Sequence, residues 1–405
     1  MVNYRAEEAY RYRVDAAELA RHRPHPKHQA NRDEARYAAA CYPMSFTKGL
    51  EHDDATGLVA DPNDFRAFRA AIDNGFVEPF TTRVPVPRSE DHPRRMWEAP
   101  TAGMVFDPQG PDAQAVTMPP APELCSDELT YEMAEVYELA ILRDTPFTAF
   151  EGTNAATLNN ATTRLNDLPY AGQGFAEADG TPGRPRQGGP TVTPQTAFRG
   201  SAPGDTKGPY LSQFMLIGNG DPPKGMIKNG AQTVDQRVSV AAREDDYMTT
   251  WDDWRDVQNG FNVNNKGRCK PVDPGQNLLP KQTRLICTPR DLATYVHFDA
   301  LYQAYLNACL LLLGQGAPFD PAFDLLSGPA SGKLMPDAAN PTTKVGYNAG
   351  GFALYGGPHI LSLVTEVATR GLKAVRYQKF IVHLRLRPEA LAGRLARADV
   401  IEKRH

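Results

Sequence analysis

Residues 376–389 read RYQKFIVHLRLRPE, and they carry the clearest functional signal in the chain. Arg376 and Lys379 are three positions apart, so a helix would place them roughly 60° apart on one face. Arg387 follows eight positions after Lys379 and directly precedes Pro388, which disfavours a helical conformation at the arginine. We therefore expect a helix that ends at Arg387, with both cations turned toward one oxyanion. A planar arginine fork and a compact lysine charge together suit a phosphate or vanadate group.

The composition is that of an ordinary globular protein. The 405 residues are 23% charged and 41% hydrophobic with a net charge of -4, which argues against a general nucleic-acid or membrane binder. The N-terminus shows no secretory signal, so we expect a soluble protein, cytoplasmic by default. The longest nearly apolar run, residues 304–313, is about half as long as a membrane span and predicts a buried helix. The cysteines form no CxxC pair and are expected to be buried free thiols: Cys41, Cys125, Cys269, Cys287 and Cys309.

Three segments show the patterns of long helices. Ser126 and an apolar rhythm predict a capped helix over residues 126–150. Thr288 as cap and Pro289 in the first position predict a second helix over 289–313, apolar on nearly all sides and therefore central in a bundle. The third helix is predicted over 358–383, with an apolar face at Ile360, Val364, Val367 and Leu372.

The remaining segments are predicted to be less regular. Residues 1–40 look like a polar helix or arm, and residues 168–208 and 316–351 are loops rich in glycine and proline. A short hairpin strand is expected within 233–248. We therefore expect an N-terminal arm over 1–40 and a mainly helical domain over 41–405, with long loops and few short strands.

Spacing alone also fits a solvated helix end, since cations near a helix C-terminus are favourable to its dipole. Several blocks of sequence, however, resemble in order the N-terminal two-thirds of the vanadium-dependent bromoperoxidases of red algae and cyanobacteria. The blocks are SFTKGL (45–50), GPDAQ (110–114), MPPAP (118–122), GPYLSQ (208–213), RDLAT (290–294), VHFDALY (296–302) and residues 361–379. The family's first vanadate motif is a lysine, a spacer and Arg-Pro, which corresponds here to Lys379, seven residues and Arg387-Pro388. Fungal chloroperoxidases and related acid phosphatases typically have six, so the spacer favours the bromoperoxidase branch.

The resemblance implies a helical-bundle fold of the haloperoxidase and acid phosphatase type, without the C-terminal part of the second bundle. It implies that Lys379 and Arg387 bind the oxygens of vanadate and that Arg376 helps define the halide position. Tyr355 and His359 fall near positions that line the family pocket. His383 lies within the motif, where a packed helix histidine is a more frequent role than a ligand.

The family's later motifs, Ser-Gly-His and Arg…His, do not occur in these residues, so no vanadium ligand is expected within this chain. We expect a haloperoxidase component that oxidises halide, with bromide favoured, by hydrogen peroxide to hypohalous acid for halogenation of small organic substrates. A partner chain or another segment would supply the missing histidines. The family forms large rings, often of twelve subunits, so a homo-oligomer is expected.

Two alternatives stay open. One is a non-catalytic assembly subunit or truncated product of the same fold, and the other is an acid phosphatase-like hydrolase of phosphate esters. The expected cofactor is vanadate. A calcium site at Asp320, Asp324 and Asp337 is disfavoured, because the loop that carries them has diverged from the relatives that bind calcium.

Overall fold

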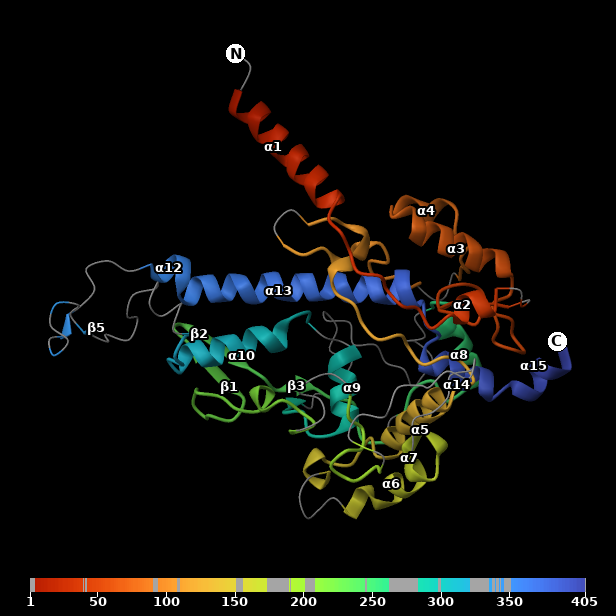
Figure 1. Cartoon of the computed structure of the whole chain (residues 1–405). Coiled ribbons are helices and arrows are strands. Elements are labelled where there is room, and N and C mark those ends of the chain that lie inside the picture. The colour runs from red at the N-terminus through yellow and green to blue at the C-terminus, as the bar shows by residue number, and fades with distance from the viewer. Residues whose placement is uncertain are drawn as a thin grey trace.

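The chain is described by a computed structural model (Figure 1), which covers residues 4–38, 40, 42–89, 94–107, 110–150, 156–172, 189, 191–200, 208–244, 246–261, 283–297, 300–320, 335–336, 339, 342, 344–345 and 351–404. Helices make up most of the regular structure in these ranges, as the sequence patterns predict. The strands that they contain form three two-stranded antiparallel sheets.

The α-helices are α1 (Tyr4–Arg21), α2 (Asp33–Arg36), α3 (Pro62–Asn74), α4 (Glu78–Thr82), α5 (Asp127–Ile141), α6 (Asn159–Asn166), α7 (Pro169–Gly172), α8 (Trp251–Gln258), α9 (Pro289–His297), α10 (Gln303–Gly314), α12 (Phe352–Tyr355), α13 (Gly357–Tyr377), α14 (Pro388–Leu395) and α15 (Ala398–Arg404). The shorter turns are the 3-10 helices η1 (Ala102–Met104), η2 (Ala113–Ala115), η3 (Phe147–Ala149) and η5 (Gln213–Met215), and the π-helical turn η6 (Gln378–His383). The strands are β1 (Met226–Asn229), β2 (Gln232–Asp235), β3 (Val238–Ser239), β4 (Thr283–Arg284), β5 (Met335–Pro336) and β6 (Lys344–Val345).

Helix α13 contacts several other elements of the fold. It spans 21 residues, and α10 lies alongside it, as Figure 1 shows. The turns η1 and η2 also lie against it. At η1 the approach is so close that a Cβ on Gly103 would lie 2.6 Å from the Cα atom of Tyr377. Packing of this kind fixes the C-terminal end of α13, where the predicted cations lie.

The predicted helix caps are confirmed. The Ser126 side chain accepts a hydrogen bond from the Leu129 amide, and α5 follows as predicted but ends at Ile141 rather than at residue 150. Thr288 Oγ1 accepts from the Asp291 amide at 3.2 Å and opens α9. These bonds satisfy amide groups that a helix start leaves without an intrahelical partner.

The helix predicted over 289–313 is two helices. Tyr302 is left-handed, with φ 57°, and it separates α9 from α10. The expected central position is also wrong for part of this segment, because Val296 is 61% exposed and Tyr305 is 62% exposed. Only one side of α10 is buried, where Leu310 and Leu311 pack with Ile227 of β1.

The hairpin prediction is confirmed in part. Strands β1 and β2 pair antiparallel, with Ile227 opposite Val234, so the hairpin begins before the predicted range. Strand β3 pairs with β4, which the sequence did not indicate.

Two apolar clusters hold the segment after α13 in place. Phe380 and Leu384 pack with residues of α3, of the loop before it and of the segment after α4, in a cluster of Phe46, Leu50, Val59, Phe65, Phe68, Ala71, Ile72 and Val84. Leu386 and Ala390 pack against α5 with Leu124, Leu129 and Met133. The segment from Phe380 to Ala390 is thus held between the cluster around α3 and the helix α5.

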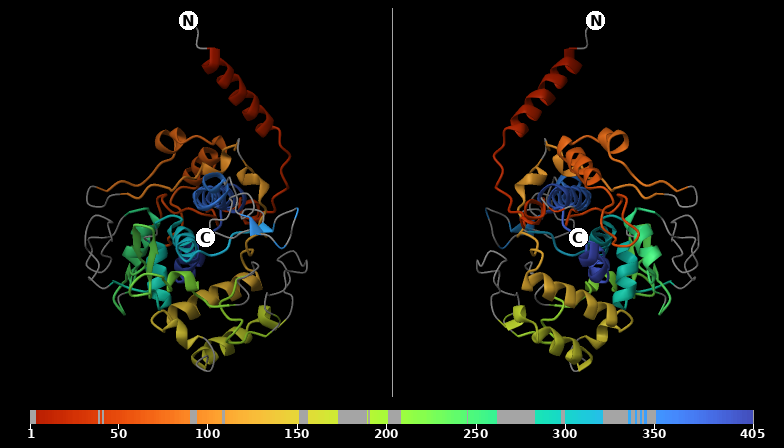
Figure 2. Two further views of the ribbon diagram at one scale, coloured as in Figure 1. Left: turned by 90° about the vertical axis from the view of Figure 1, so that its left-hand side faces the viewer. Right: turned by 90° about the vertical axis from the view of Figure 1, so that its right-hand side faces the viewer.

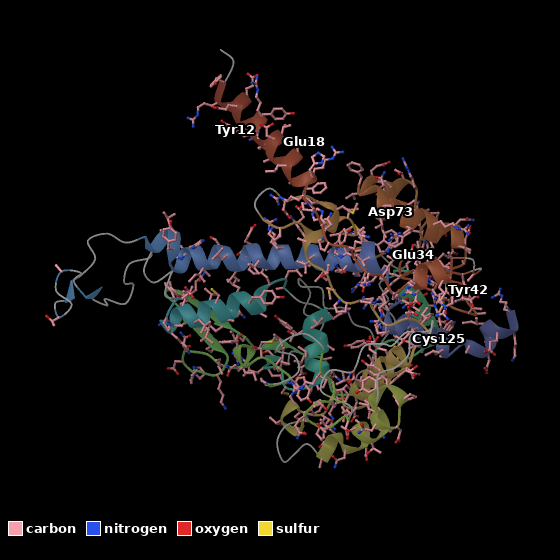
Figure 3. The ribbon with its side chains drawn as sticks, viewed as in Figure 1. Tyr12, Glu18, Glu34, Tyr42, Asp73 and Cys125 are labelled. Atoms are coloured by element: carbon pink, nitrogen blue, oxygen red, sulfur yellow. The ribbon has the colours of Figure 1, made fainter. Side chains whose placement is uncertain are left out.

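Helix α1 extends away from the body of the molecule in both views of Figure 2. Ala20 is its one buried residue, and Tyr12 and Glu18 lie on it far from the core in Figure 3. Residues 4–21 thus form a polar helix, whereas Asn31 and Asp33 are buried, so an arm over the whole of 1–40 stays a prediction. The extended segment behind α1 is anchored, since His25 Nε2 lies 2.9 Å from Asp112 Oδ2.

The prediction of buried thiols is wrong for Cys125 and Cys287, which are exposed, and right for Cys309. Cys125 has a left-handed φ of 66° in the turn before α5, which places its side chain outside the core. Cys41 and Cys269 lie outside the described residues. Within the described ranges, none of the helices combines the length and the apolar character that crossing a membrane requires.

Candidate functional site

Helix α13 changes its winding just before it ends. In the π-helical turn Gln378–His383, the Leu384 amide donates to the Lys379 carbonyl at 3.0 Å, a wider closure than that of an α-helix. Leu384 then adopts a left-handed conformation with φ 40°, which ends the helix. Its carbonyl accepts a hydrogen bond from the Phe46 amide at 2.8 Å. The reversal is therefore held from outside by the chain near residue 46.

Arg387 lies in the connection between two helices. It is extended, with φ -71° and ψ 150°, and it precedes Pro388, the first residue of α14. The predicted effect of Pro388 on Arg387 is confirmed, and the helix that carries Lys379 ends at His383, as predicted from its apolar pattern, rather than at Arg387. Because this connection is short, Arg387 stays close enough to Lys379 for the two charges to interact.

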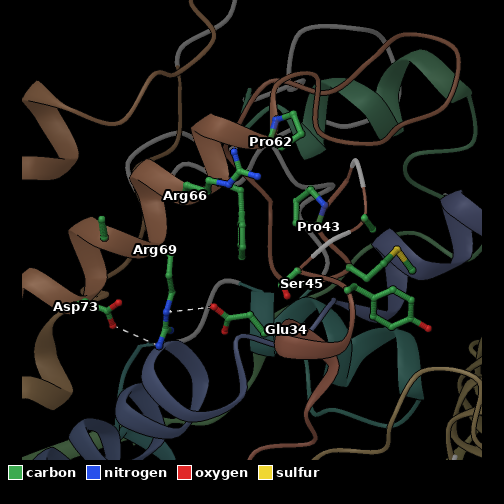
Figure 4. Close-up of a pocket in the computed structure, with 13 residues that line it drawn as sticks. Glu34, Pro43, Ser45, Pro62, Arg66, Arg69 and Asp73 are labelled. Atoms are coloured by element: carbon green, nitrogen blue, oxygen red, sulfur yellow. Dashed lines mark ion pairs between the residues drawn. The ribbon is translucent and has the colours of Figure 1, made fainter. Parts of the chain in front are cut away.

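An arginine from α3 supports the wide turn. Arg69 donates from Nη1 to the Phe380 carbonyl at 3.0 Å and from Nη2 to the Ile381 carbonyl at 3.4 Å. The same guanidinium lies 3.3 Å from both Glu34 and Asp73, as the dashed lines of Figure 4 mark. These three side chains line a pocket of about 300 Å³ between α2 and α3.

Lys379 lies among rings and cations. Its Nζ is 4.8 Å from the centre of the Phe380 ring and 5.4 Å from that of Phe46. Burial lowers the pKa of Lys379, and the neighbouring charges of Arg376 and Arg387 lower it further. None of the described carboxylates forms an ion pair with this ammonium group. Within the described part of the chain, Lys379 is therefore a half-buried cation without an ion-pair partner.

Arg376 lies one turn before Lys379 and is only 9% exposed. It forms an ion pair with Glu98, whose side chain is 63% exposed. The Nε atom of Arg376 is buried and has no hydrogen-bond partner among the described residues. Burying a guanidinium N–H without an acceptor costs free energy, so binding of a group that accepts a hydrogen bond is favoured at this position.

Glu389 links Arg387 to a lysine from the N-terminal part of the chain. Its Oε1 accepts from Arg387 Nε at 2.5 Å and from Lys48 Nζ at 3.1 Å. Burial raises the pKa of Glu389, but Lys48 and Arg387 more than offset this effect, and the pKa is lowered overall. Burial also lowers the pKa of Lys48.

Four cations and two carboxylates thus meet at the end of α13: Arg376, Lys379, Arg387, Lys48, Glu98 and Glu389. The cations outnumber the carboxylates, and the side chain in the middle, Lys379, has no anion of its own among the residues described. Together with the buried Nε of Arg376, this donor set fits a tetrahedral oxyanion such as phosphate or vanadate. It offers such a group charge and N–H donors but no protein ligand for a metal atom.

Comparison with known proteins assigns the family. The vanadium-dependent bromoperoxidases of Corallina pilulifera and Corallina officinalis are each 39% identical to this chain over 431 residues, covering 96% of this chain and 68% of theirs. The chain belongs to the vanadium-dependent bromoperoxidase family. The vanadium-dependent bromoperoxidase of Ascophyllum nodosum is 31% identical over 400 residues, covering 97% of this chain and 61% of its own. No family model matches the sequence.

A solved bromoperoxidase structure supports the fold. The second vanadate-dependent bromoperoxidase of Ascophyllum nodosum, described as homohexameric, aligns with a TM-score of 0.65 at 24% identity. The alignment covers 97% of this chain and 58% of that one. The mainly helical fold predicted from the sequence is confirmed, and this chain spans less than two thirds of the length of that bromoperoxidase.

The structure brings Arg376, Lys379 and Arg387 of this bromoperoxidase-family chain together. It separates Tyr355 and His359 from them. Tyr355 belongs to α12 and His359 to the first turn of α13, so about 30 Å of helix lies between His359 and Lys379. Their ring centres are 6.3 Å apart, and they form a separate contact. Within this chain the two side chains are therefore not neighbours of the three cations, and their pocket-lining role stays a prediction.

The other predicted residues are His383 and the three aspartates named for calcium. His383 is the last residue of the π-helical turn and is half-buried, and its role as a packed helix histidine stays a prediction. Of the three aspartates named for calcium, Asp324 and Asp337 lie outside the described residues, and Asp320 is exposed. No cluster of three or more His, Cys, Asp or Glu side chains that could hold a metal ion is found in the described part of the chain.

Lys48 and Glu389 are members of the site that sequence reasoning missed. They are 341 positions apart, so no local pattern joins them. Lys48 lies inside the block SFTKGL, one of the stretches that resembles the bromoperoxidases, and that block was the one available signal. Glu389 directly follows Pro388, in the first turn of α14, where an acidic residue is ordinary.

Proposed function

We propose that this chain contributes one half of the vanadate site of a haloperoxidase, which oxidises halide, with bromide favoured, by hydrogen peroxide to hypohalous acid for halogenation of small organic substrates. The observation that carries the proposal is the group of Arg376, Lys379 and Arg387 at the end of α13, with a buried Arg376 Nε that lacks an acceptor among the described residues. Family membership gives the oxyanion its identity.

In this proposal Lys379 and Arg387 hold the oxyanion. Lys379 supplies a charge that is weakly solvated, because it lies over two aromatic rings, and this strengthens its attraction for an anion. Arg387 supplies the fork of its terminal nitrogens, since its Nε is occupied by Glu389. Arg376 stands beside them as the cation that faces the halide.

Vanadate, when bound, supplies Lewis-acid activation of hydrogen peroxide without a change in its own oxidation state. The residues of this chain contribute preorganised positive charge, which stabilises negative charge that develops on oxygen. The histidines that complete such a site lie outside these residues, on another segment or on a partner chain. Apolar side chains on α13 that such a segment could cover include Val367, 68% exposed, and Val375, 50% exposed.

We further propose a homo-oligomer. The solved relative is described as homohexameric, and α1 presents Tyr4, Tyr10 and Leu19 to solvent at 74%, 62% and 70% exposure. Aromatic side chains of this kind are enriched at protein interfaces. The number of subunits is measured by light scattering of the full chain with and without residues 1–21.

Anion binding tests the first proposal directly. Orthovanadate or inorganic phosphate binding to the full chain is measured by calorimetry, and Lys379→Met and Arg387→Met are each expected to weaken it at least roughly tenfold. Arg385→Met is the matched control, because Arg385 belongs to the same segment but pairs with Glu132 of α5 at 2.7 Å. Equal effects of all three variants, or no binding to the wild type, would contradict the proposal.

Activity separates the alternatives. Bromination of a phenol dye is compared with hydrolysis of a phosphate ester, with and without vanadate, on the chain combined with the segment that carries Ser-Gly-His and Arg…His. Dye bromination that requires vanadate supports the haloperoxidase. Phosphate-ester hydrolysis without vanadate would support the acid phosphatase, and absence of both with intact assembly would support a non-catalytic subunit.

A further inference from the structure

The ion pair between Lys48 and Glu389 extends the candidate site beyond the three predicted cations. Lys48 comes from the loop before α3 and Glu389 from α14, and their charged atoms are 3.1 Å apart. Their side chains are 30% and 23% exposed, so neither is a freely solvated surface group. Ion pairs at exposed sites contribute little to stability, and half-buried ones carry a desolvation cost. The position of this ion pair beside the cation cluster therefore indicates a role in the cluster rather than in stability.

The backbone around Lys48 is fixed from several directions. The Lys48 carbonyl accepts from Trp97 Nε1 at 2.7 Å, and the Gly49 amide donates to the Gln258 carbonyl at 2.6 Å. Gly49 itself is left-handed at φ 97°, and a Cβ there would lie 2.6 Å from Trp97 Nε1. The loop cannot shift easily, so Lys48 Nζ is presented at a defined position.

Glu389 is fixed equally well. Trp254 Nε1 donates to the Glu389 carbonyl at 2.8 Å, and a Cβ on Gly393, one turn later, would lie 2.2 Å from the Trp254 ring. With its backbone held in this way, Glu389 accepts from the Nε of Arg387. Among the described residues the Arg387 guanidinium bonds through Nε, and its side chain is 45% exposed, so its two terminal nitrogens are available to an anion.

Holding Arg387 with a carboxylate has a cost, because a negative charge next to the site repels an oxyanion. Lys48 offsets that charge. Lys48 Nζ and Arg387 Nε both donate to Oε1 of Glu389, at 3.1 and 2.5 Å, so two cations bind one carboxylate oxygen. The charge of Glu389 is therefore shared between two cations rather than left to oppose the anion.

We infer that Lys48 and Glu389 are positioning residues of the oxyanion site: Glu389 orients the Arg387 guanidinium through Nε, and Lys48 offsets the charge of Glu389 so that the site stays cationic. This inference rests on the proposed function, because it concerns the same anion. It adds two residues from opposite ends of the chain, neither of which touches the oxyanion.

Charge compensation supplies the test. Dissociation constants of inorganic phosphate and of orthovanadate are measured for the wild type, Lys48→Met, Glu389→Gln and the double variant. Lys48→Met leaves Glu389 with one cation fewer and is expected to weaken binding by about tenfold. Glu389→Gln keeps an acceptor for Arg387 but removes the charge, and it is expected to tighten binding several-fold. The double variant restores the charge balance and is expected to bind within about twofold of the wild type.

A structural role alone would predict a different outcome, in which the double variant is at least as impaired as Lys48→Met. Lys48→Arg keeps the charge and is expected to bind like the wild type, and Arg385→Met removes a cation from the same segment that has its own partner, Glu132. If Lys48→Met does not fold, the tightening expected of Glu389→Gln still decides the question. Binding that is unaffected by Lys48→Met overturns the inference but not the proposed function, whereas a wild type that binds neither anion overturns both.

Discussion

Replacing Arg69 by methionine is expected to loosen the turn that presents Lys379. Arg69 provides a charged donor at 3.0 Å to the Phe380 carbonyl and a longer one, at 3.4 Å, to the Ile381 carbonyl. A hydrogen bond to a charged group contributes about 1.5–3 kcal/mol. Its ion pairs with Glu34 and Asp73 are partly exposed and add little. We therefore expect the π-helical turn to lose about 3 kcal/mol.

Hydrogen exchange measures this loss locally. The amide of Leu384 closes the π-helical turn on the Lys379 carbonyl, so its exchange reports the opening of that turn. A loss of about 3 kcal/mol accelerates exchange on the order of a hundredfold, as long as the turn opens locally. Arg66→Met is the matched control, since Arg66 lies one turn earlier on α3 and bonds only Asn63 Oδ1 at 2.7 Å in the described structure. Equal exchange in the two variants would refute the support assigned to Arg69.

Further predictions concern the acid response and two packed contacts. Burial lowers the pKa of His52 from 6.5 to about 4, so on acidification the unfolded chain takes up a proton before the folded chain does. About 3 kcal/mol of stability should therefore be lost as pH falls from about 6.5 to about 4. This dependence of the unfolding free energy on pH should disappear in His52→Gln, and an unchanged dependence would contradict the assignment. Gly103→Ala should lower the free energy of unfolding by about 1–3 kcal/mol, because its Cβ would meet the backbone of Tyr377; an unchanged melting temperature would show that η1 can move away. Arg290→Met should cost about 3–5 kcal/mol, since it leaves Asp144, bound at 2.7 and 2.8 Å, without its buried partner; thermal unfolding that differs from the wild type by less than about 1 kcal/mol would contradict this.

Helix starts were predictable because they are local. Ser126 and Thr288 each bond an amide three residues ahead, and nothing distant is required. The break between α9 and α10 was not predictable, because a left-handed Tyr302 carries no mark in its residue type. Tertiary packing imposes such a conformation, and the apolar pattern of the sequence is the same for one continuous helix and for two helices with a break.

The candidate site divides in the same way. Arg376, Lys379 and Arg387 lie within twelve positions and share one motif, so their meeting could be predicted. Lys48 meets Glu389 only because the Phe46 loop folds back onto the end of α13, where its amide bonds the Leu384 carbonyl. That contact depends on the whole fold, and no periodicity in the sequence announces it.

The π-helical turn at the end of α13 also bears on how the lysine–arginine spacing changes among related proteins. A turn closed by a bond from Leu384 to Lys379 holds one residue more than an α-helical turn would. A sequence with one residue fewer between its lysine and its arginine can therefore keep both cations where they are by winding that turn normally. The extra residue is accommodated in the turn whose carbonyls accept hydrogen bonds from Arg69, so a difference of one residue in the spacer does not require the two cations to move apart.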